Sequence, residues 1–130
     1  MKKFIFSKPT FIHKTGKSKN SPFISHNVRP LPFKINDSTL RIFFASRLKD
    51  DTPSPTFIDV DINDPTIIKK VNKKLLVKAG KNGAFDSDGV VFTQILPYKN
   101  KYLVQYSGWK RSRYKMTIDM GIGYLLADKK

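Results

Sequence analysis

The sequence predicts an all-β fold of antiparallel strands, on the basis of three observations. Short runs of β-branched and aromatic residues alternate with turn residues at intervals of about ten to fifteen. Eight prolines are scattered along the chain, and no segment carries a capped apolar stripe with the period of a helix. With 39% hydrophobic and 12% aromatic residues in 130 positions, the chain can bury one core. We therefore expect a single β domain with little helix.

The apolar runs place the expected strands in two series. The first series comprises 26–35, 39–47 and 56–62, followed by a run at 66–78 that the polar residues 72–74 divide into two pieces. The second series comprises 89–98, 102–109 and 117–128. Residues 56–62 alternate between two faces, which predicts a strand with one solvent-exposed side. The nearly continuous apolar runs RIFFA and YLVQY predict strands that are buried on both faces.

The two series resemble each other, which suggests a repeat. Each series begins with a strand that opens at a polar loop. A turn, a second strand rich in apolar and aromatic residues, a loop and a third strand follow. A repeat of about 60 residues built from antiparallel strands is typical of propeller blades. An ordinary sandwich of seven strands is the alternative.

The N-terminal 21 residues differ in composition from the rest of the chain. They contain six lysines and no acidic residue, and they include the polar run KTGKSKNSP. Such a segment buries too little apolar surface to fold firmly, so we expect residues 1–21 to form a poorly ordered basic arm. The β domain is expected to cover 22–130.

The chain carries a formal charge of +15, from 20 lysines and five arginines against ten aspartates and no glutamate. A positive field of this size concentrates polyanions. The excess is mostly lysine spread over the arm and turns, however, and we interpret it as a solvated surface rather than a nucleic-acid site. The alternative is a small basic binding module for nucleic acid or an acidic glycan, in which the loop KRSRYK (110–115) would contribute Arg111 and Arg113.

Several functional classes are excluded or disfavoured by composition. The chain has no cysteine, which rules out disulfides, a thiolate nucleophile and cysteine-ligated zinc. The N-terminal apolar run is only three residues long, too short for a secretion signal, and no apolar run is long enough to span a membrane. We therefore expect a cytoplasmic location, no membrane partner and no cofactor.

The stretch GAFDSDGVV contains the strongest candidates for chemistry. Asp86 and Asp88 open the second series, between Gly83 and Gly89. In a propeller, side chains at strand openings point into a shared central pocket, where a carboxylate can act as a general base or hold a sugar hydroxyl. The alternative is a turn whose aspartates bond their own backbone. A metal loop is disfavoured, because no further carboxylates follow at calcium-loop spacing.

Four other residues lie at corresponding openings or strand ends. His26 opens the first series, and Arg29 shares its face only if a bulge intervenes, because their spacing is odd. Arg47 ends an apolar strand, where it could clamp a ligand or cap Asp50 or Asp51. Trp109, the only tryptophan, is either a flat platform for a sugar ring or part of the core.

Five motifs occur in an order that resembles a known family. They are HxxxP at 26–30, LRIFFASR ending at Arg47, FIDVDINDP at 57–65, GxFDxxGV at 83–90 and KYLVQYSGW at 101–109. Together they resemble the N-terminal part of bacterial glycosidase-like five-bladed β-propellers from polysaccharide gene clusters. These are distant relatives of invertases, levanases, arabinanases and β-mannoside phosphorylases. The resemblance covers about residues 22–127.

This resemblance implies a partial five-bladed propeller, with blade one at about 22–78 and blade two at about 83–128. It also implies a sugar site at the propeller axis, to which His26, Arg47, Asp86 and Trp109 correspond by motif. Ser87 and Asp88 stand where the family form has Asp and then Ser, so the second carboxylate has moved to the other face of the local backbone.

The activity implied is carbohydrate binding without cleavage by this chain alone. Glycoside cleavage ordinarily needs two carboxyl groups, and the family's general acid is typically a glutamate, which this chain lacks. The expected partners are a carbohydrate and the remaining propeller blades from a second chain. Without a further strand, Tyr124, Leu125 and Leu126 should form an exposed apolar edge that favours association.

Overall fold

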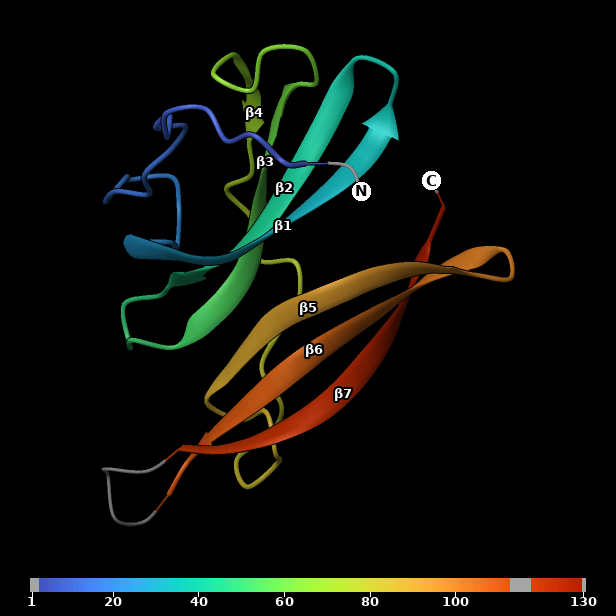
Figure 1. Cartoon of the computed structure of the whole chain (residues 1–130). Coiled ribbons are helices and arrows are strands. Elements are labelled where there is room, and N and C mark those ends of the chain that lie inside the picture. Colours follow the sequence, from blue (N-terminus) through green and yellow to red (C-terminus); the bar gives the residue numbers. More distant parts are fainter. Residues whose placement is uncertain (1–2, 113–117, 130) are drawn as a thin grey trace.

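A computed structural model describes residues 3–112 and 118–129, and these residues form two antiparallel β-sheets. Sheet A contains four strands in the order β1 (Ser25–Asn36), β2 (Thr39–Arg47), β3 (Pro53–Asp61) and β4 (Ile68–Val71). Sheet B contains three strands in the order β5 (Gly89–Tyr98), β6 (Lys101–Arg111) and β7 (Ile118–Asp128), as Figure 1 shows. Neither sheet closes on itself. The all-β prediction is confirmed: the described residues contain no helix, and hence none that could cross a membrane.

The strand bounds agree with the sequence where turn residues are clear. β2 and β5 begin and end at the predicted residues, whereas β3 begins three residues early, at Pro53. The run predicted at 66–78 yields only β4, and the expected second piece is not a strand. Asn72 explains the ending, because its side-chain amide donates to the carbonyl of Lys74 at 2.6 Å and also bonds Thr56 Oγ1 at 3.1 Å. These side-chain bonds hold the chain in a turn instead of a ladder.

The middle of sheet A is covered on both faces, whereas every residue of the edge strand β4 is exposed. Phe44, Ile58 and Val60 form a buried cluster on one face, against which Ile12 of the N-terminal segment packs. Phe23, from the same segment, is 1% exposed. Sheet B covers the other face, so β3 has buried residues from Pro53 to Val60. The prediction that β3 has one solvent-exposed side is therefore wrong, since β3 lies between β2 and β4 with a layer above and below it.

Burial of β3 places an aspartate in the interior. Asp59 is 7% exposed, and its two carboxylate oxygens accept hydrogen bonds from Arg41 Nε at 2.7 Å and Arg41 Nη2 at 2.9 Å. The same guanidinium lies 3.7 Å from the ring centre of Phe57. A buried carboxylate is tolerated when it is paired and hydrogen-bonded in this way.

The two sheets pack together mainly through aromatic side chains. Phe43 of β2 lies 5.9 Å from Phe92 of β5, and Phe33 of β1 meets the edge of Tyr102 of β6 at 5.0 Å between ring centres. Val90, Val104 and Tyr106 complete the buried cluster of sheet B. β5 lies against β1, β2 and β3, so the first strand of sheet B forms most of the contact between the sheets.

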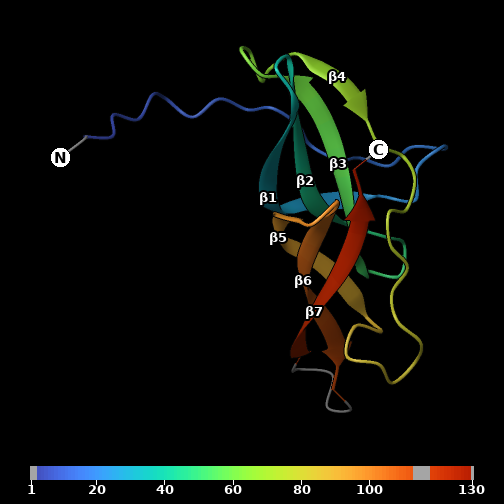
Figure 2. The same ribbon diagram turned by 90° about the vertical axis from the view of Figure 1, so that its right-hand side faces the viewer.

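The N-terminal segment is divided between a free part and a packed part. Residues 3–11 have no regular secondary structure and extend away from both sheets, as Figure 2 shows. From Ile12 onward the segment lies on sheet A, where the His13 carbonyl accepts a hydrogen bond from Asn27 Nδ2 at 3.1 Å. Of the basic arm predicted at 1–21, only residues 3–11 lie free of both sheets among the described residues, and from here on we call these residues the arm.

Candidate functional site

The two sheets approach each other closely where β3 and β5 begin, next to the start of β1, a region we name the strand-start end. The register brings Ser25 opposite Arg47 and Arg47 opposite Pro53 in sheet A, and Gly89 opposite Trp109 in sheet B. A Cβ atom on Gly89 would lie 2.4 Å from Pro53 Cγ, so only glycine permits the sheets to approach this closely. Side chains at these strand ends, distant in sequence, are thereby brought together.

Arg47 and Trp109 are the predicted site residues that make a direct contact across the sheets. The Arg47 guanidinium lies 5.6 Å from the ring centre of Trp109, within the range of a cation–π interaction. Arg47 also donates from Nη1 to the carbonyl of Asp51, with Nε 3.7 Å from the Asp51 carboxylate. Arg47 therefore caps Asp51, one of the two alternatives that the sequence offered, and its side chain is half-buried.

Asp88 is hydrogen-bonded to β6 at Trp109. Its backbone N–H donates to the carbonyl of Trp109 at 2.8 Å. Its carboxylate accepts hydrogen bonds from the backbone N–H of Arg111 at 3.0 Å and from Ser87 Oγ at 3.1 Å. The Arg111 N–H, aided by the Ser87 hydroxyl and the neighbouring basic charges, lowers the pKa of Asp88 despite an opposing effect of desolvation. An ionised carboxylate of this kind serves as a hydrogen-bond acceptor or base rather than as a general acid.

Asp86 points to a different partner from Asp88. Its carboxylate accepts a hydrogen bond from the Tyr106 hydroxyl at 2.9 Å, and burial together with this bond raises the pKa of Tyr106. Asp86 and Phe85 lie directly over Gly108, where a Cβ atom would come within 2.6 Å of both side chains. The candidate catalytic pair is thus split, with Asp86 bonded toward the core and Asp88 bonded at the end of β6.

His26 and Arg29 lie on β1 in an uncommon backbone conformation. Their φ angles are 60° and 53°, a left-handed region that non-glycine residues seldom occupy and that is often found at functional sites. Register shifts flank Val28 on both sides, so β1 contains the kind of irregularity that the odd spacing makes a condition for His26 and Arg29 to share a face. Both side chains are exposed, and His26 Nδ1 lies 2.8 Å from Ser25 Oγ. His26 therefore adjoins the strand-start end, whereas Arg29 lies beyond a bulge.

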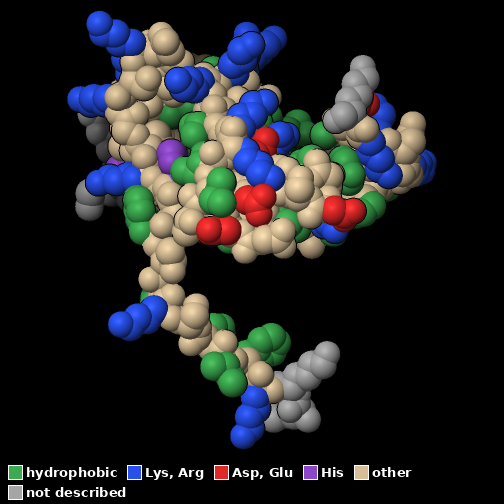
Figure 3. All heavy atoms as spheres, turned by 90° about the horizontal axis from the view of Figure 1, so that it is seen from above, with side chains coloured by type: hydrophobic (Ala, Val, Ile, Leu, Met, Phe, Trp, Pro, Cys, Tyr) green, Lys and Arg blue, Asp and Glu red, His purple; other side chains and the backbone are tan. Residues whose placement is uncertain are grey.

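The basic loop offers little support for a nucleic-acid site. Of KRSRYK, only residues 110–112 fall within the described residues, and Arg113 lies outside them. Lys110 Nζ donates to the carbonyl of Gly83 at 3.0 Å, and Arg111 Nη2 donates to that of Asp50 at 3.4 Å. Figure 3 shows basic side chains distributed over the visible face rather than gathered in one patch.

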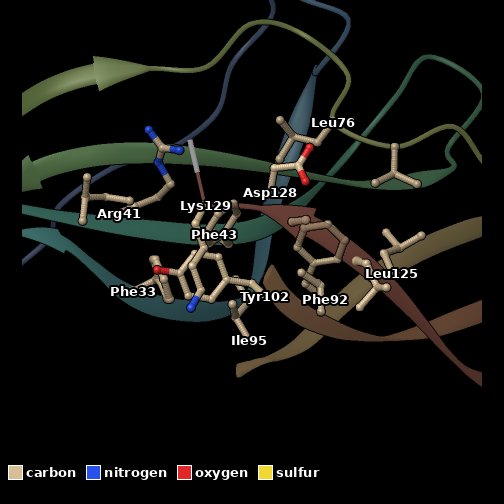
Figure 4. Close-up of a pocket in the computed structure, with 15 residues that line it drawn as sticks. Phe33, Arg41, Phe43, Leu76, Phe92, Ile95, Tyr102, Leu125, Asp128 and Lys129 are labelled. Atoms are coloured by element: carbon tan, nitrogen blue, oxygen red, sulfur yellow. The ribbon is translucent and has the colours of Figure 1, made fainter. Parts of the chain in front are cut away.

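An apolar cleft between the sheets was not anticipated from the sequence. It has a volume of about 740 Å³ and is lined by aromatic and aliphatic side chains, among them Phe33, Phe43, Phe92, Tyr102 and Leu125. Figure 4 shows the rings of Phe33 and Phe43 from sheet A near those of Tyr102 and Phe92 from sheet B, and Asp128 is another of the lining residues. The sequence predicted the apolar strands that line this cleft, but a run of apolar residues does not say which strands face each other.

In residues 3–112 and 118–129, no group of three or more histidine or acidic side chains is arranged to hold a metal ion. By fold and by these contacts, the described chain is an all-β protein of two open sheets with a charged and aromatic cluster where they meet. Comparison with protein-family models, curated proteins and solved structures finds no match. We therefore interpret the site from its own geometry and chemistry.

Proposed function

We propose that the strand-start end binds carbohydrate, and that the two sheets are two blades of a glycosidase-like propeller. The Arg47–Trp109 pair is the observation that carries this proposal. A flat aromatic ring offers apolar surface to the face of a sugar ring, and a guanidinium donates paired hydrogen bonds to neighbouring hydroxyls. The ordered sequence motifs around His26, Arg47, Asp86 and Trp109 support the same proposal.

Asp88 adds the acceptor that such a site needs. Its carboxylate is ionised at neutral pH, as the lowering of its pKa from the ordinary value of 3.8 requires, and can accept a hydrogen bond from a sugar hydroxyl. Binding sites for small polar ligands commonly combine an apolar surface with a few fixed polar groups. Arg47 on β2, Trp109 on β6 and Asp88 just before β5 supply these elements, and His26 follows Ser25, the β1 residue that pairs with Arg47.

The proposal is binding rather than cleavage by this chain acting alone. An ionised Asp88 is a poor proton donor, and Asp86 is engaged with Tyr106. Glycoside hydrolysis ordinarily requires a second carboxyl group that protonates the leaving oxygen. We therefore propose that this end forms one part of a sugar pocket, which further blades would complete.

The fluorescence of Trp109 can test this proposal, because Trp109 is the only tryptophan in the chain. We expect its fluorescence to change saturably when the protein is titrated with one or more members of a panel of neutral and acidic oligosaccharides. Arg47→Ala should weaken binding by tenfold or more, since a hydrogen bond from a charged group contributes about 1.5–3 kcal/mol.

Lys34→Ala is the matched control, because it removes one positive charge from an exposed side chain on the part of β1 that pairs with Leu40, away from Arg47. Its affinity should equal that of the unmodified protein. If no oligosaccharide binds, by fluorescence or by calorimetry, or if both variants bind equally well, the strand-start end is not the carbohydrate site.

A further inference from the structure

β7 is an edge strand whose charged residues, Asp119 and Asp128, lie only near its two ends. It pairs along its whole length with β6, and within the described residues no strand lies on its other side. Proteins usually blunt such edges with lysine, proline or a bulge, because free N–H and C=O groups recruit further strands. β7 is 11 residues long, contains neither lysine nor proline and pairs in unbroken register. It is therefore a long, regular template for another strand.

One face of β7 is also apolar and open to solvent. Alternate residues along β7 point to this face, and from 118 to 126 all of them are hydrophobic. Their exposed fractions range from 48% to 88%: Ile118, Met120, Ile122, Tyr124 and Leu126. On the opposite face, Phe85 covers Gly121 and Tyr106 covers Gly123. The exposed residues thus form an apolar stripe beside the free edge, and an added strand that is apolar on alternate positions would extend this stripe.

The arm has the complementary composition. Phe4, Ile5, Phe6 and Phe11 are 84%, 95%, 89% and 76% exposed, which is unusual for large apolar side chains. In Figure 3 the arm extends from the body with hydrophobic side chains along it. Residues 3–8 alternate, so Phe4 and Phe6 share one face of an extended chain and Ile5 lies on the other. Pro9 follows, and its missing N–H would end a ladder there.

The charges of the two segments are opposite. The charged residues of β7 are Asp119 and Asp128, both acidic, whereas those of the arm are Lys3 and Lys8, both basic. Opposite charges favour the pairing of an arm with β7. Like charges disfavour the pairing of two arms or of two β7 strands. Because Ile12 anchors the arm on the face of sheet A opposite sheet B, the arm leads away from the β7 of its own chain.

We propose that the arm of one copy of this chain adds to the β7 edge of a second copy, as a fourth strand of sheet B. Residues 3–8 supply main-chain hydrogen bonds to the free edge, in the manner of strand addition. Phe4 and Phe6 extend the stripe formed by Ile122 and Tyr124, and the lysines of the arm lie near the aspartates of β7. The proposal is independent of carbohydrate binding at the strand-start end.

Sedimentation equilibrium tests the proposal with point variants of the full chain. The solution should have about 0.15 M ionic strength, where screening over about 8 Å weakens the repulsion between copies of charge +15. We expect the unmodified protein to associate, and we expect both Phe4→Ser/Phe6→Ser and Ile122→Lys to be monomeric. Ile67→Lys is the control for the second variant, since Ile67 is 54% exposed and lies outside both segments. It should associate normally.

Mixing the two monomeric variants provides the decisive measurement. Phe4→Ser/Phe6→Ser retains an intact β7 edge, and Ile122→Lys retains an intact arm. The mixture should therefore form a dimer and nothing larger. Circular dichroism should show that all variants fold alike, which the exposure of the substituted residues favours. A monomeric unmodified protein would overturn the proposal and leave the edge to a different partner. An arm variant that still associates, or a mixture that stays monomeric, would overturn it equally.

Discussion

Asp88 is the residue at which local hydrogen bonding has the clearest consequence for ionisation. Its carboxylate is bonded by the backbone N–H of Arg111 and by the Ser87 hydroxyl, and these bonds favour the charged form. A carboxyl group whose pKa is lower in the folded than in the unfolded chain stabilises the fold above the unfolded value of 3.8. That contribution is lost as the pH falls through the folded-state pKa.

We therefore predict that Asp88→Asn lowers the free energy of unfolding near neutral pH but not in strong acid. The difference should be at most about 1 kcal/mol, because solvent screens this partly exposed group. Urea denaturation of both proteins from about pH 7 to about pH 2 measures it. A difference that stays constant over this range would contradict the role assigned to the ionised carboxylate.

Arg41 and Asp59 form a charged pair in which the carboxylate is buried and the guanidinium is half-buried. The paired hydrogen bonds of 2.7 and 2.9 Å satisfy the carboxylate, and the aromatic ring of Phe57 covers the guanidinium at 3.7 Å. Removing one partner from a buried pair leaves the other charge unsatisfied, which costs more than the pair itself contributes. The pair is consistent with β3 lying in the middle of the fold.

At the scale of elements, residues 12–24 act as a third layer over sheet A. Ile12 packs on the cluster of Phe44, Ile58 and Val60, and Phe23 is almost completely buried. Phe11, one residue before this layer begins, is 76% exposed. The boundary between free arm and packed layer therefore falls within a segment of uniform basic composition.

We predict that Phe23→Ala and Phe11→Ala differ sharply in their effect on stability. Loss of a buried phenylalanine costs about 3–5 kcal/mol, through lost transfer energy and a residual cavity. Loss of an exposed one changes stability by less than about 0.5 kcal/mol. Urea denaturation of the two variants compares them directly, with Phe11→Ala serving as the control. Equal destabilisation would mean that the layer over sheet A ends elsewhere.

For the molecule as a whole, the two sheets are joined by aromatic contacts that link distant parts of the chain. Phe43 and Phe92 lie 5.9 Å apart, and Leu31, Val77 and Leu125 pack around the same cluster. A core shared by both sheets makes each dependent on the other. We expect the sheets to unfold in one cooperative transition rather than independently.

A double-mutant cycle with Phe43→Leu and Phe92→Leu tests this coupling. We predict an interaction energy of about 0.5–1.5 kcal/mol, because the two rings touch across the sheets. Trp109 fluorescence reports the surroundings of β6 together with its contact to Arg47 of sheet A, and far-ultraviolet circular dichroism reports both sheets, so the two transitions should coincide. The control pairs Phe43→Leu with Phe23→Leu, on the opposite face of sheet A, where the effects should add. Separate transitions would contradict a shared core.

Much of the strand pattern could be predicted from the sequence, because it arises from local causes. Turn residues delimit β2 and β5 at their observed ends, and the sequence left open whether a bulge separates His26 from Arg29, which the register shifts in β1 decide. Composition alone excluded cysteine chemistry. Each of these inferences depends on residues that are neighbours in the chain.

Other features were decided only by contacts between distant residues. Alternation along β3 indicated two different faces, but only the packing of β2, β4 and two covering layers buried both and paired Asp59 with Arg41. Likewise, the sequence offered Arg47, Trp109, Asp86 and Asp88 as candidates, whereas the tertiary structure joined the first two and separated the carboxylates. The physical reason is that periodicity reports which side chains share a face, and only chain folding determines what covers that face.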